Sequence, residues 1–225
     1  MLIDLHTHTL PLSDDSELTP DELIAHAKRA GLDAICLTEH DAFWNDDDIA
    51  ALCRKHDFLI LPGVEINTEE EHLLVFGLKK WILGMSRAAF VKEIVDKAGG
   101  AVIVAHPYRR KILKSEDPEN KRYYRELNRA CQNPIYRMVD AVEVFNARGT
   151  ERQNAFSAEL AERLKLRGIA GSDAHEARDI GRAATFFERK LTTLQELIAE
   201  LKAGRFRVAD PSEIKENLYH QEAER

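Results

Sequence analysis

Histidine and acidic residues stand near both ends of the chain with a spacing that suits metal binding. His6 and His8 lie two residues apart at the end of an apolar run, and Asp173 and His175 repeat that spacing far downstream. Residues i and i+2 of an extended strand point to the same face, so each pair can present two ligand groups to one cation. One such pair is also compatible with a strand end that has no ligand role. The surrounding sequence has to decide whether the pair binds a metal.

More residues of these types end, or directly follow, other apolar runs. They are His40, Glu65 and His106. In a barrel of parallel strands, the C-terminal strand ends meet on one face, where active sites form. Convergence on that face explains five such cases better than separate core histidines do, and it predicts a shared metal site. Three other histidines fall in helical or tail contexts and are assigned no function: His26, His56 and His220.

Apolar runs alternate with helical patterns, which is typical of βα units on a mostly parallel sheet. Capping residues and glycine stops predict helices at residues 21–30, 47–55, 86–98, 151–167 and 193–203. The expected strands are residues 2–8, 34–38, 58–61, 73–78, 101–105, 141–145, 169–171 and 184–187. Seven or eight strands suit a barrel. We expect one domain over residues 1–209, an excursion over the barrel mouth at 115–138, and a polar tail at 210–225.

The composition narrows the class of protein. The chain has 225 residues, of which 44% are hydrophobic, so it can build one good core. Its net charge of −7 disfavours nucleic acid as a partner for the whole surface. No apolar run is long enough to span a bilayer, so we expect a cytoplasmic protein with no membrane partner. The three cysteines form no C-x-x-C pair, which argues against a disulfide framework and a thiolate zinc site.

Taken together, the motifs resemble the polymerase and histidinol phosphatase (PHP) family of metal-dependent phosphoesterases. The resemblance follows, in order, His6-Thr-His8, Thr38-Glu-His40-Asp41, Gly63-Val-Glu65, His72-Leu-Leu, Ala105-His106-Pro107, Glu143-Val-Phe-Asn146 and Gly171-Ser-Asp173-Ala-His175. It implies a distorted (β/α)7 TIM-like barrel and a cluster of two or three divalent metal ions. The ligands that it implies are His6, His8, Asp15, His40, Glu65, His72, His106, Asp173 and His175.

One stretch departs from the family pattern. After the first histidine pair the family usually has Ser-Asp-Gly, whereas this chain has Ser13-Asp14-Asp15-Ser16. Counting back from Thr19 favours Asp15 as the ligand, and Asp14 is the alternative.

The donor types indicate the metal and its chemistry. Imidazole and carboxylate ligands without a thiolate suit Zn, Mn or Fe(II). Such ions lower the pKa of a bound water and neutralise phosphoryl oxygens during hydrolysis. Glu65 is the candidate to bridge two ions, because its carboxylate has two oxygens. His40 and His175 are candidates for proton transfer to the leaving group, although ligation is the preferred role.

A basic segment directly follows His106-Pro107. We predict that Arg109 binds the substrate phosphate, since a guanidinium can hold two phosphate oxygens. Arg148 is a second candidate for the same role, and Asn146 and Arg182 are weaker ones. The other basic residues of the segment are expected to be solvated: Arg110, Lys111 and Lys114. Glu143 and Asn146 are alternatively predicted to orient ligand histidines.

The predicted function is hydrolysis of small phosphomonoesters, nucleotides among them, by a metal-activated hydroxide. Three alternatives stay open: a histidinol-phosphate phosphatase, an oligonucleotide or nucleotide bisphosphate hydrolase, and a metal-stabilised binding module without turnover. A nucleic-acid substrate would make Tyr108, Tyr123 and Tyr124 candidates for stacking on a base, whereas packing onto the barrel is their expected role. The sequence indicates no oligomeric state.

Overall fold

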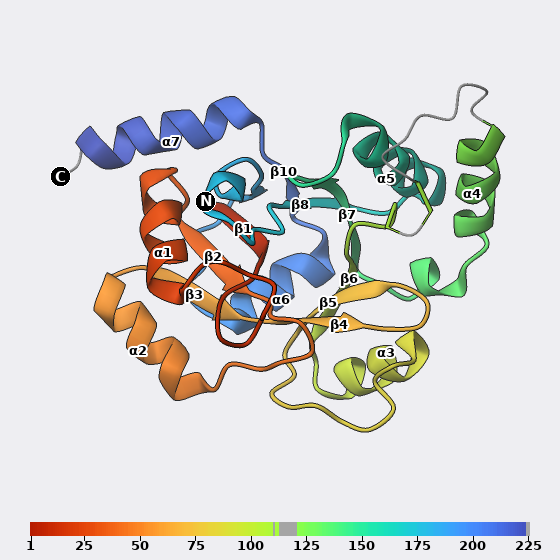
Figure 1. The fold of residues 1–225 in the computed structure, drawn as a ribbon, viewed down its shortest axis with the longest axis horizontal. Coiled ribbons are helices and arrows are strands. Elements are labelled where there is room, and N and C mark those ends of the chain that lie inside the picture. Colours follow the sequence, from red (N-terminus) through yellow and green to blue (C-terminus); the bar gives the residue numbers. More distant parts are fainter. Residues whose placement is uncertain (110, 113–120, 224–225) are drawn as a thin grey trace.

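The computed structural model describes residues 1–109, 111–112 and 121–223, and within them the chain forms two five-stranded sheets flanked by helices (Figure 1). The first sheet has the strand order β10-β9-β1-β2-β3 and the second has the order β4-β5-β6-β7-β8. The strands are β1 (Leu2–Thr7), β2 (Ala34–Leu37), β3 (Leu59–Pro62), β4 (Val64–Asn67), β5 (His72–Phe76), β6 (Ala101–Val104), β7 (Ala141–Asn146), β8 (Gly168–Gly171), β9 (Thr185–Phe187) and β10 (Phe206–Val208).

Local signals in the sequence set the helix ends. The first predicted helix begins as a capping box, in which the Thr19 and Glu22 side chains each bind the other's backbone N–H, and Gly31 follows its end with φ of 84°. The five predicted helices are all present, shifted by at most a few residues. The α-helices are α1 (Pro20–Arg29), α2 (Asp46–His56), α3 (Ala88–Lys97), α4 (Lys121–Cys131), α5 (Glu151–Leu164), α6 (Leu194–Ala203) and α7 (Pro211–Ala223). Two short 3-10 helices cover Pro134–Arg137 and Ala177–Asp179.

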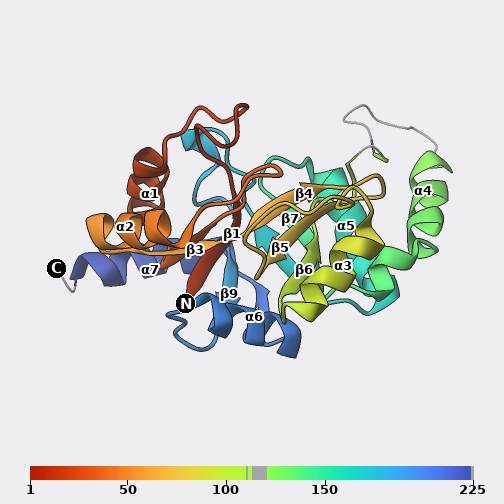
Figure 2. The same cartoon turned by 90° about the horizontal axis from the view of Figure 1, so that it is seen from below.

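The two sheets enclose a common apolar core. Ile3 and Leu5 of β1 point into it, together with Leu74 and Phe76 of β5 from the other sheet. Leu2 of β1 and Val75 of β5 pack on the opposite faces of the sheets, against helices, because side chains alternate between faces. Helices α1 and α2 cover the first sheet and α3 to α5 cover the second (Figures 1 and 2). Helix α6 contributes Leu197 and Leu201 to the common core and lies at the same end of the sheets as the N-terminus (Figure 2).

The mixed α/β class is confirmed, but within the described residues the strands do not form the closed barrel that was expected. Strand β4, which the sequence did not predict, forms an antiparallel hairpin with β5, and β5 is also antiparallel to β6. Two isolated bridges, Thr7 with Ala174 and His40 with Glu65, replace continuous ladders where the sheets meet. Only Gly63 separates β3 from β4, and its N–H donates to the Leu37 carbonyl of β2.

Two elements lie where the sequence predicted an excursion and a tail. Helix α4 buries Tyr123 and Leu127 and packs against α5, beside the second sheet and not across the strand ends (Figure 1). Residues 113–120 of the predicted excursion lie outside the described part of the chain. The C-terminal segment contains helix α7, whose Ile214 is buried with α1 residues. Among the described helices, none combines the length and apolarity needed to cross a bilayer.

Candidate metal centre

The strand ends bring the predicted ligands together. His6 lies within β1 and His8 follows it; His106 follows β6, and Asp173 and His175 follow β8. Glu65 lies in β4, not at the end of a parallel strand as predicted. His72 is the first residue of β5. Because β5 is antiparallel to β6, His72 lies beside the C-terminal end of β6, where the Ala105 N–H donates to the His72 carbonyl.

Four ligand atoms form a first group, and none of them makes a hydrogen bond of good geometry among the described residues, although His40 Nδ1 lies 2.9 Å from Glu65 Oε2. They are His6 Nε2, His8 Nε2, Glu65 Oε2 and Asp173 Oδ1, and all four are buried. Each nitrogen lies 3.3 to 3.5 Å from each oxygen. Tetrahedral ligands at zinc distances of about 2.0–2.2 Å are themselves roughly 3.3–3.6 Å apart. An unpaired buried polar atom costs about 1–3 kcal/mol, so this group fits a cation better than it fits a protein core.

The other oxygen of Glu65 faces a second group. His72 Nδ1 lies 2.8 Å and His106 Nε2 2.9 Å from Glu65 Oε1. The two oxygens of this carboxylate therefore face different sets of imidazoles, which is the arrangement a bridging ligand requires.

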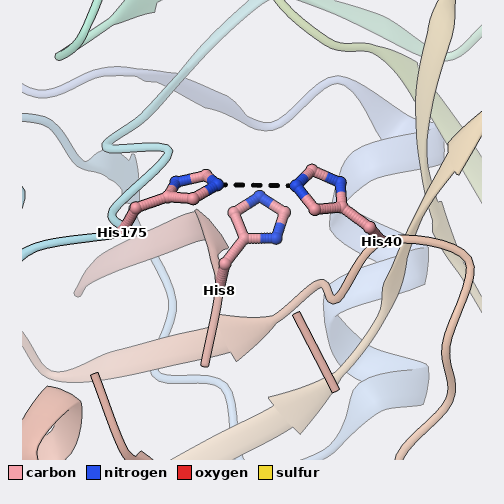
Figure 3. Close-up of side chains that lie close together, drawn as sticks. All are labelled: His8, His40 and His175. Atoms are coloured by element: carbon pink, nitrogen blue, oxygen red, sulfur yellow. Dashed lines mark hydrogen bonds between the residues drawn. The ribbon is translucent and has the colours of Figure 1, made fainter. Parts of the chain in front are cut away.

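A third group lies on the solvent side of His8. Figure 3 shows the rings of His8, His40 and His175 facing one another, with 3.4 Å between His40 Nε2 and His175 Nε2. The carboxylate of Asp15 lies 3.0 Å from His175 Nε2 and 3.2 Å from His40 Nε2. Asp14 and Asp15 are both exposed, and Asp15 is the one that makes these contacts, which favours the first of the two alternatives.

Electrostatic coupling keeps the acids of the cluster ionised. Burial alone would raise the pKa of Glu65, but His6, His106 and His40 lower it well below its usual range. Burial likewise raises the pKa of Asp173, but His6 and His8 lower it more strongly, so that the net shift is downward. Both carboxylates are therefore anions at neutral pH, as cation ligands have to be.

Two histidines of the first group differ in their protonation. Burial lowers the pKa of His8 to about 4, so its imidazole is neutral at pH 7. Burial also lowers the pKa of His6, but Glu143, Asp173 and Glu65 raise it well above its usual value. A cation that binds to His6 Nε2 would displace this proton, so metal binding is expected to release protons.

Outer residues fix the orientation of the ligands. Glu143 Oε1 lies 3.0 Å from His6 Nδ1, and Glu143 Oε2 accepts hydrogen bonds from the His106 N–H and the Asn146 Nδ2 amide. The same Asn146 amide donates to Asp173 Oδ2 at 3.3 Å. These contacts favour the orienting role for Glu143 and Asn146 over phosphate binding by Asn146.

The backbone is strained at two of the ligand positions. His106 has φ of 26° and Asp173 has φ of 54°, a region that residues with a Cβ atom rarely adopt. Such conformations persist where surrounding contacts hold them, and they cluster at functional sites. Here the Asp173 N–H donates to the His6 carbonyl at 2.8 Å, which places the strained residue beside the first histidine pair.

The basic residues divide into exposed and paired ones. Arg109 is exposed, with Nη1 3.4 Å from His106 Nε2, and Arg148 and Arg182 are exposed as well. Lys111 was expected to be solvated, but it is partly buried and its ammonium group pairs with Glu71 at 2.6 Å and donates to the Pro107 carbonyl. This pair ties the segment after His106 to the β4–β5 turn. Arg110 and Lys114 lie outside the described residues.

The three tyrosines considered for stacking on a base differ in exposure. Tyr123 packs edge-on against Phe156, and its hydroxyl donates to Glu159, which fits the expected packing role. Tyr124 is half exposed. Tyr108 is buried, with its ring 6.1 Å from that of His106.

Two residues of this region received no role from the sequence. Glu39 and Ser13 are buried beside the third group and bind one another. The signal for Glu39 was its position: an acidic residue directly before His40, at the end of an apolar run.

The mixed α/β fold and the imidazole–carboxylate cluster define a protein built around a candidate multinuclear metal centre. Residues 4–139 match the family model of the PHP domain, and residues 151–206 match that of a PHP-associated region. The first match covers more than half of the chain, so the protein belongs to the PHP family, as its motifs predicted.

Relatives of similar length share this fold. PsfC from Pseudomonas syringae PB-5123 superposes with a TM-score of 0.61 at 21% identity, over 99% of this chain and 98% of PsfC. A protein from Bifidobacterium adolescentis, provisionally assigned as a metal-dependent phosphoesterase, gives a TM-score of 0.58 at 18% identity, over 88% of this chain and 96% of that one. An uncharacterized protein of Methanocaldococcus jannaschii is 24% identical over 202 residues, which are 80% of this chain and 84% of the relative.

Proposed function

We propose that the protein is a metal-dependent phosphoesterase that hydrolyses small phosphomonoesters. The observation that carries this proposal is the first ligand group, in which the nitrogen–oxygen distances between four buried atoms match those between neighbouring ligands of one ion. Glu65 supports more than one ion, because its second oxygen faces His72 and His106. Membership of the PHP family and the name of the Bifidobacterium protein favour phosphoester hydrolysis.

We assign metal binding to the buried cluster and phosphate binding to exposed arginines. The nine predicted ligands would hold two or three Zn, Mn or Fe ions, with Glu65 shared between the first two groups. Bound ions supply a hydroxide nucleophile at neutral pH and charge neutralisation on phosphoryl oxygens. We assign His40 and His175 to ligation with Asp15, in preference to proton transfer. Arg109 and Arg148, both exposed, would bind the substrate phosphate. We also propose that the two bridged sheets correspond to the distorted TIM-like barrel of the family.

We expect purified protein to contain two or three equivalents of transition metal per chain, because the nine predicted ligands exceed what one tetrahedral or octahedral ion can use. Elemental analysis of protein reconstituted with Zn, Mn or Fe(II) measures this number. A chain that retains no metal after reconstitution would contradict the central claim.

A substrate screen tests the reaction itself. Protein loaded with each metal would be assayed with an aryl phosphate, sugar phosphates, mononucleotides, a nucleotide 3′,5′-bisphosphate, histidinol phosphate and short oligonucleotides. We expect hydrolysis of several small phosphomonoesters with modest differences in kcat/KM, since discrimination requires shaped contacts. A wide preference for histidinol phosphate, the bisphosphate or an oligonucleotide would establish that alternative instead. Bound metal without any turnover would identify a binding module.

Arg109→Ala should raise KM for phosphorylated substrates about tenfold or more while bound metal stays unchanged. The expected cause is the loss of a substrate contact that belongs to no ligand group. Arg54→Ala is the matched control, because Arg54 is exposed on α2 near the start of β3, at the opposite end of that strand from the site. An unchanged KM for the Arg109 variant would show that Arg109 is a solvated surface residue without a role in substrate binding.

A further inference from the structure

The buried Glu39 carboxylate is held by four hydrogen bonds from uncharged donors. Oε1 accepts from the Thr9 hydroxyl and from Trp44 Nε1 at 2.9 Å, and Oε2 accepts from the Thr9 N–H at 2.8 Å and the Ser13 hydroxyl at 2.6 Å. Glu39 is fully buried, and the described residues give it no ion pair. A buried carboxylate without a cation is costly, so this arrangement calls for a role beyond stability.

Ser13 connects this carboxylate to the metal centre. Its hydroxyl proton is donated to Glu39, so its lone pairs are left to accept. The His40 N–H donates to Ser13 Oγ at 3.2 Å, and His8 Nδ1 lies 3.3 Å from the same oxygen. Because Ser13 Oγ has no further proton to offer, His8 Nδ1 has to be the donor in this contact.

We infer that Glu39 is a positioning residue that sets the tautomer of His8 through Ser13. With the proton held on Nδ1, the Nε2 lone pair of His8 points toward Glu65 and Asp173, where the proposed metal site needs it. Thr9 and Ser13, which both bind Glu39, also precede Asp15 on the loop that carries it into the third group. The inference rests on the proposed metal centre and assigns a role to two residues outside its ligand set.

Glutamine in place of Glu39 would reverse this chain of hydrogen bonds. A glutamine side chain has one acceptor oxygen and one donor NH2 group, so it cannot accept from all four donors. If its NH2 faces Ser13, Ser13 Oγ accepts and its own proton turns toward His8 Nδ1. The Nε2–H tautomer of His8 is then favoured, and a protonated Nε2 cannot bind a metal ion. Residues that orient ligand histidines typically change metal affinity about 10–100-fold when mutated.

The test has two readouts on the full chain. Long-range 15N–1H correlation spectra of metal-free protein report the His8 tautomer, and competition with a chelator reports zinc affinity. The anionic Glu65 and Asp173 lie 3.4 and 3.3 Å from His8 Nε2 and favour Nε2–H in the metal-free state. We therefore expect a larger Nδ1–H fraction in the wild type than in Glu39→Gln, and zinc affinity that is at least about tenfold weaker in the variant. Glu200→Gln is the matched control, since Glu200 is equally buried but pairs with Arg205 and Arg189 away from the strand ends.

A second variant tests the same inference in case Glu39→Gln does not fold. Ser13→Ala removes the intermediate hydroxyl and leaves Glu39 with its Thr9 and Trp44 donors. We expect it to abolish the tautomer preference and to weaken zinc binding. Wild-type tautomer and zinc affinity in a folded Glu39→Gln or Ser13→Ala protein would overturn the inference. Failure of the wild type to bind zinc would instead count against the proposed function, while the spectra would still decide the tautomer.

Discussion

Glu65→Gln is expected to remove more than one equivalent of bound metal per chain and to lower kcat/KM at least about a thousandfold. The side chain lies within 3.5 Å of five histidines, which are His6, His8, His40, His72 and His106. One amide oxygen cannot serve two ions as a carboxylate does. Metal ions supply several kcal/mol of transition-state stabilisation, and each loss of about 1.4 kcal/mol is tenfold in rate.

Elemental analysis and kinetics of the same preparations measure both parts of this prediction. Glu200→Gln again serves as the control for neutralising a buried glutamate, and it should keep its metal. Full metal content in Glu65→Gln would show that this residue does not bridge the two groups.

His8→Ala and Asp173→Ala should both lower bound metal and abolish most turnover, with His8→Ala affecting two groups at once. His8 Nε2 belongs to the first group, and the His8 ring stacks on that of His40 at 4.1 Å within the third. Asp173 contributes its unpaired Oδ1 to the first group. Loss of one ligand from a buried site leaves the ion with incomplete coordination, so affinity and activity fall together.

The control for these variants is His26→Ala, a partly buried histidine in the middle of α1 that lies outside the ligand groups. Metal content and kcat/KM would be measured for all three proteins, with folding checked by circular dichroism. Turnover that persists in His8→Ala and Asp173→Ala would place the chemistry elsewhere on the molecule.

Much of the fold could be predicted from local signals in the sequence, such as helix-capping residues and glycines at helix ends. The capping box at Thr19 and the stops at Gly31 and Gly204 mark helix ends that the structure reproduces. Strand β4 was missed because Val64 to Asn67 is short and follows β3 after only Gly63. Closure of the barrel could not be judged either, since the pairing of β4 with β5 depends on contacts between strands and not on the periodicity of either one.

The candidate site was more predictable for its inner ligands than for their supports. The strand spacing of His6 and His8 predicted them as ligands, whereas Asp15 and His72 were predicted only from the family resemblance. Asp15 lies on a loop whose length differs from the family pattern, so only its position beside His40 and His175 favours it over Asp14. Ser13 matched the serine of the family pattern but received no role, because a serine hydroxyl acquires its role from partners that the fold brings to it.

Because only isolated bridges join the two sheets within the described residues, a metal ion bound between them would also hold the sheets together. Glu65 exchanges backbone hydrogen bonds with Glu39 and Asp41, and the Asp173 N–H binds the His6 carbonyl. Ligands from β1 and its loop face ligands from β4 and β8, so an ion held among them would act as a cross-link between two half-structures. Metal occupancy would then govern whether the halves unfold as one cooperative unit or open separately at this seam. Protection of the Glu65 and Asp173 amides against hydrogen exchange would rise with metal loading, well before global stability reports any change.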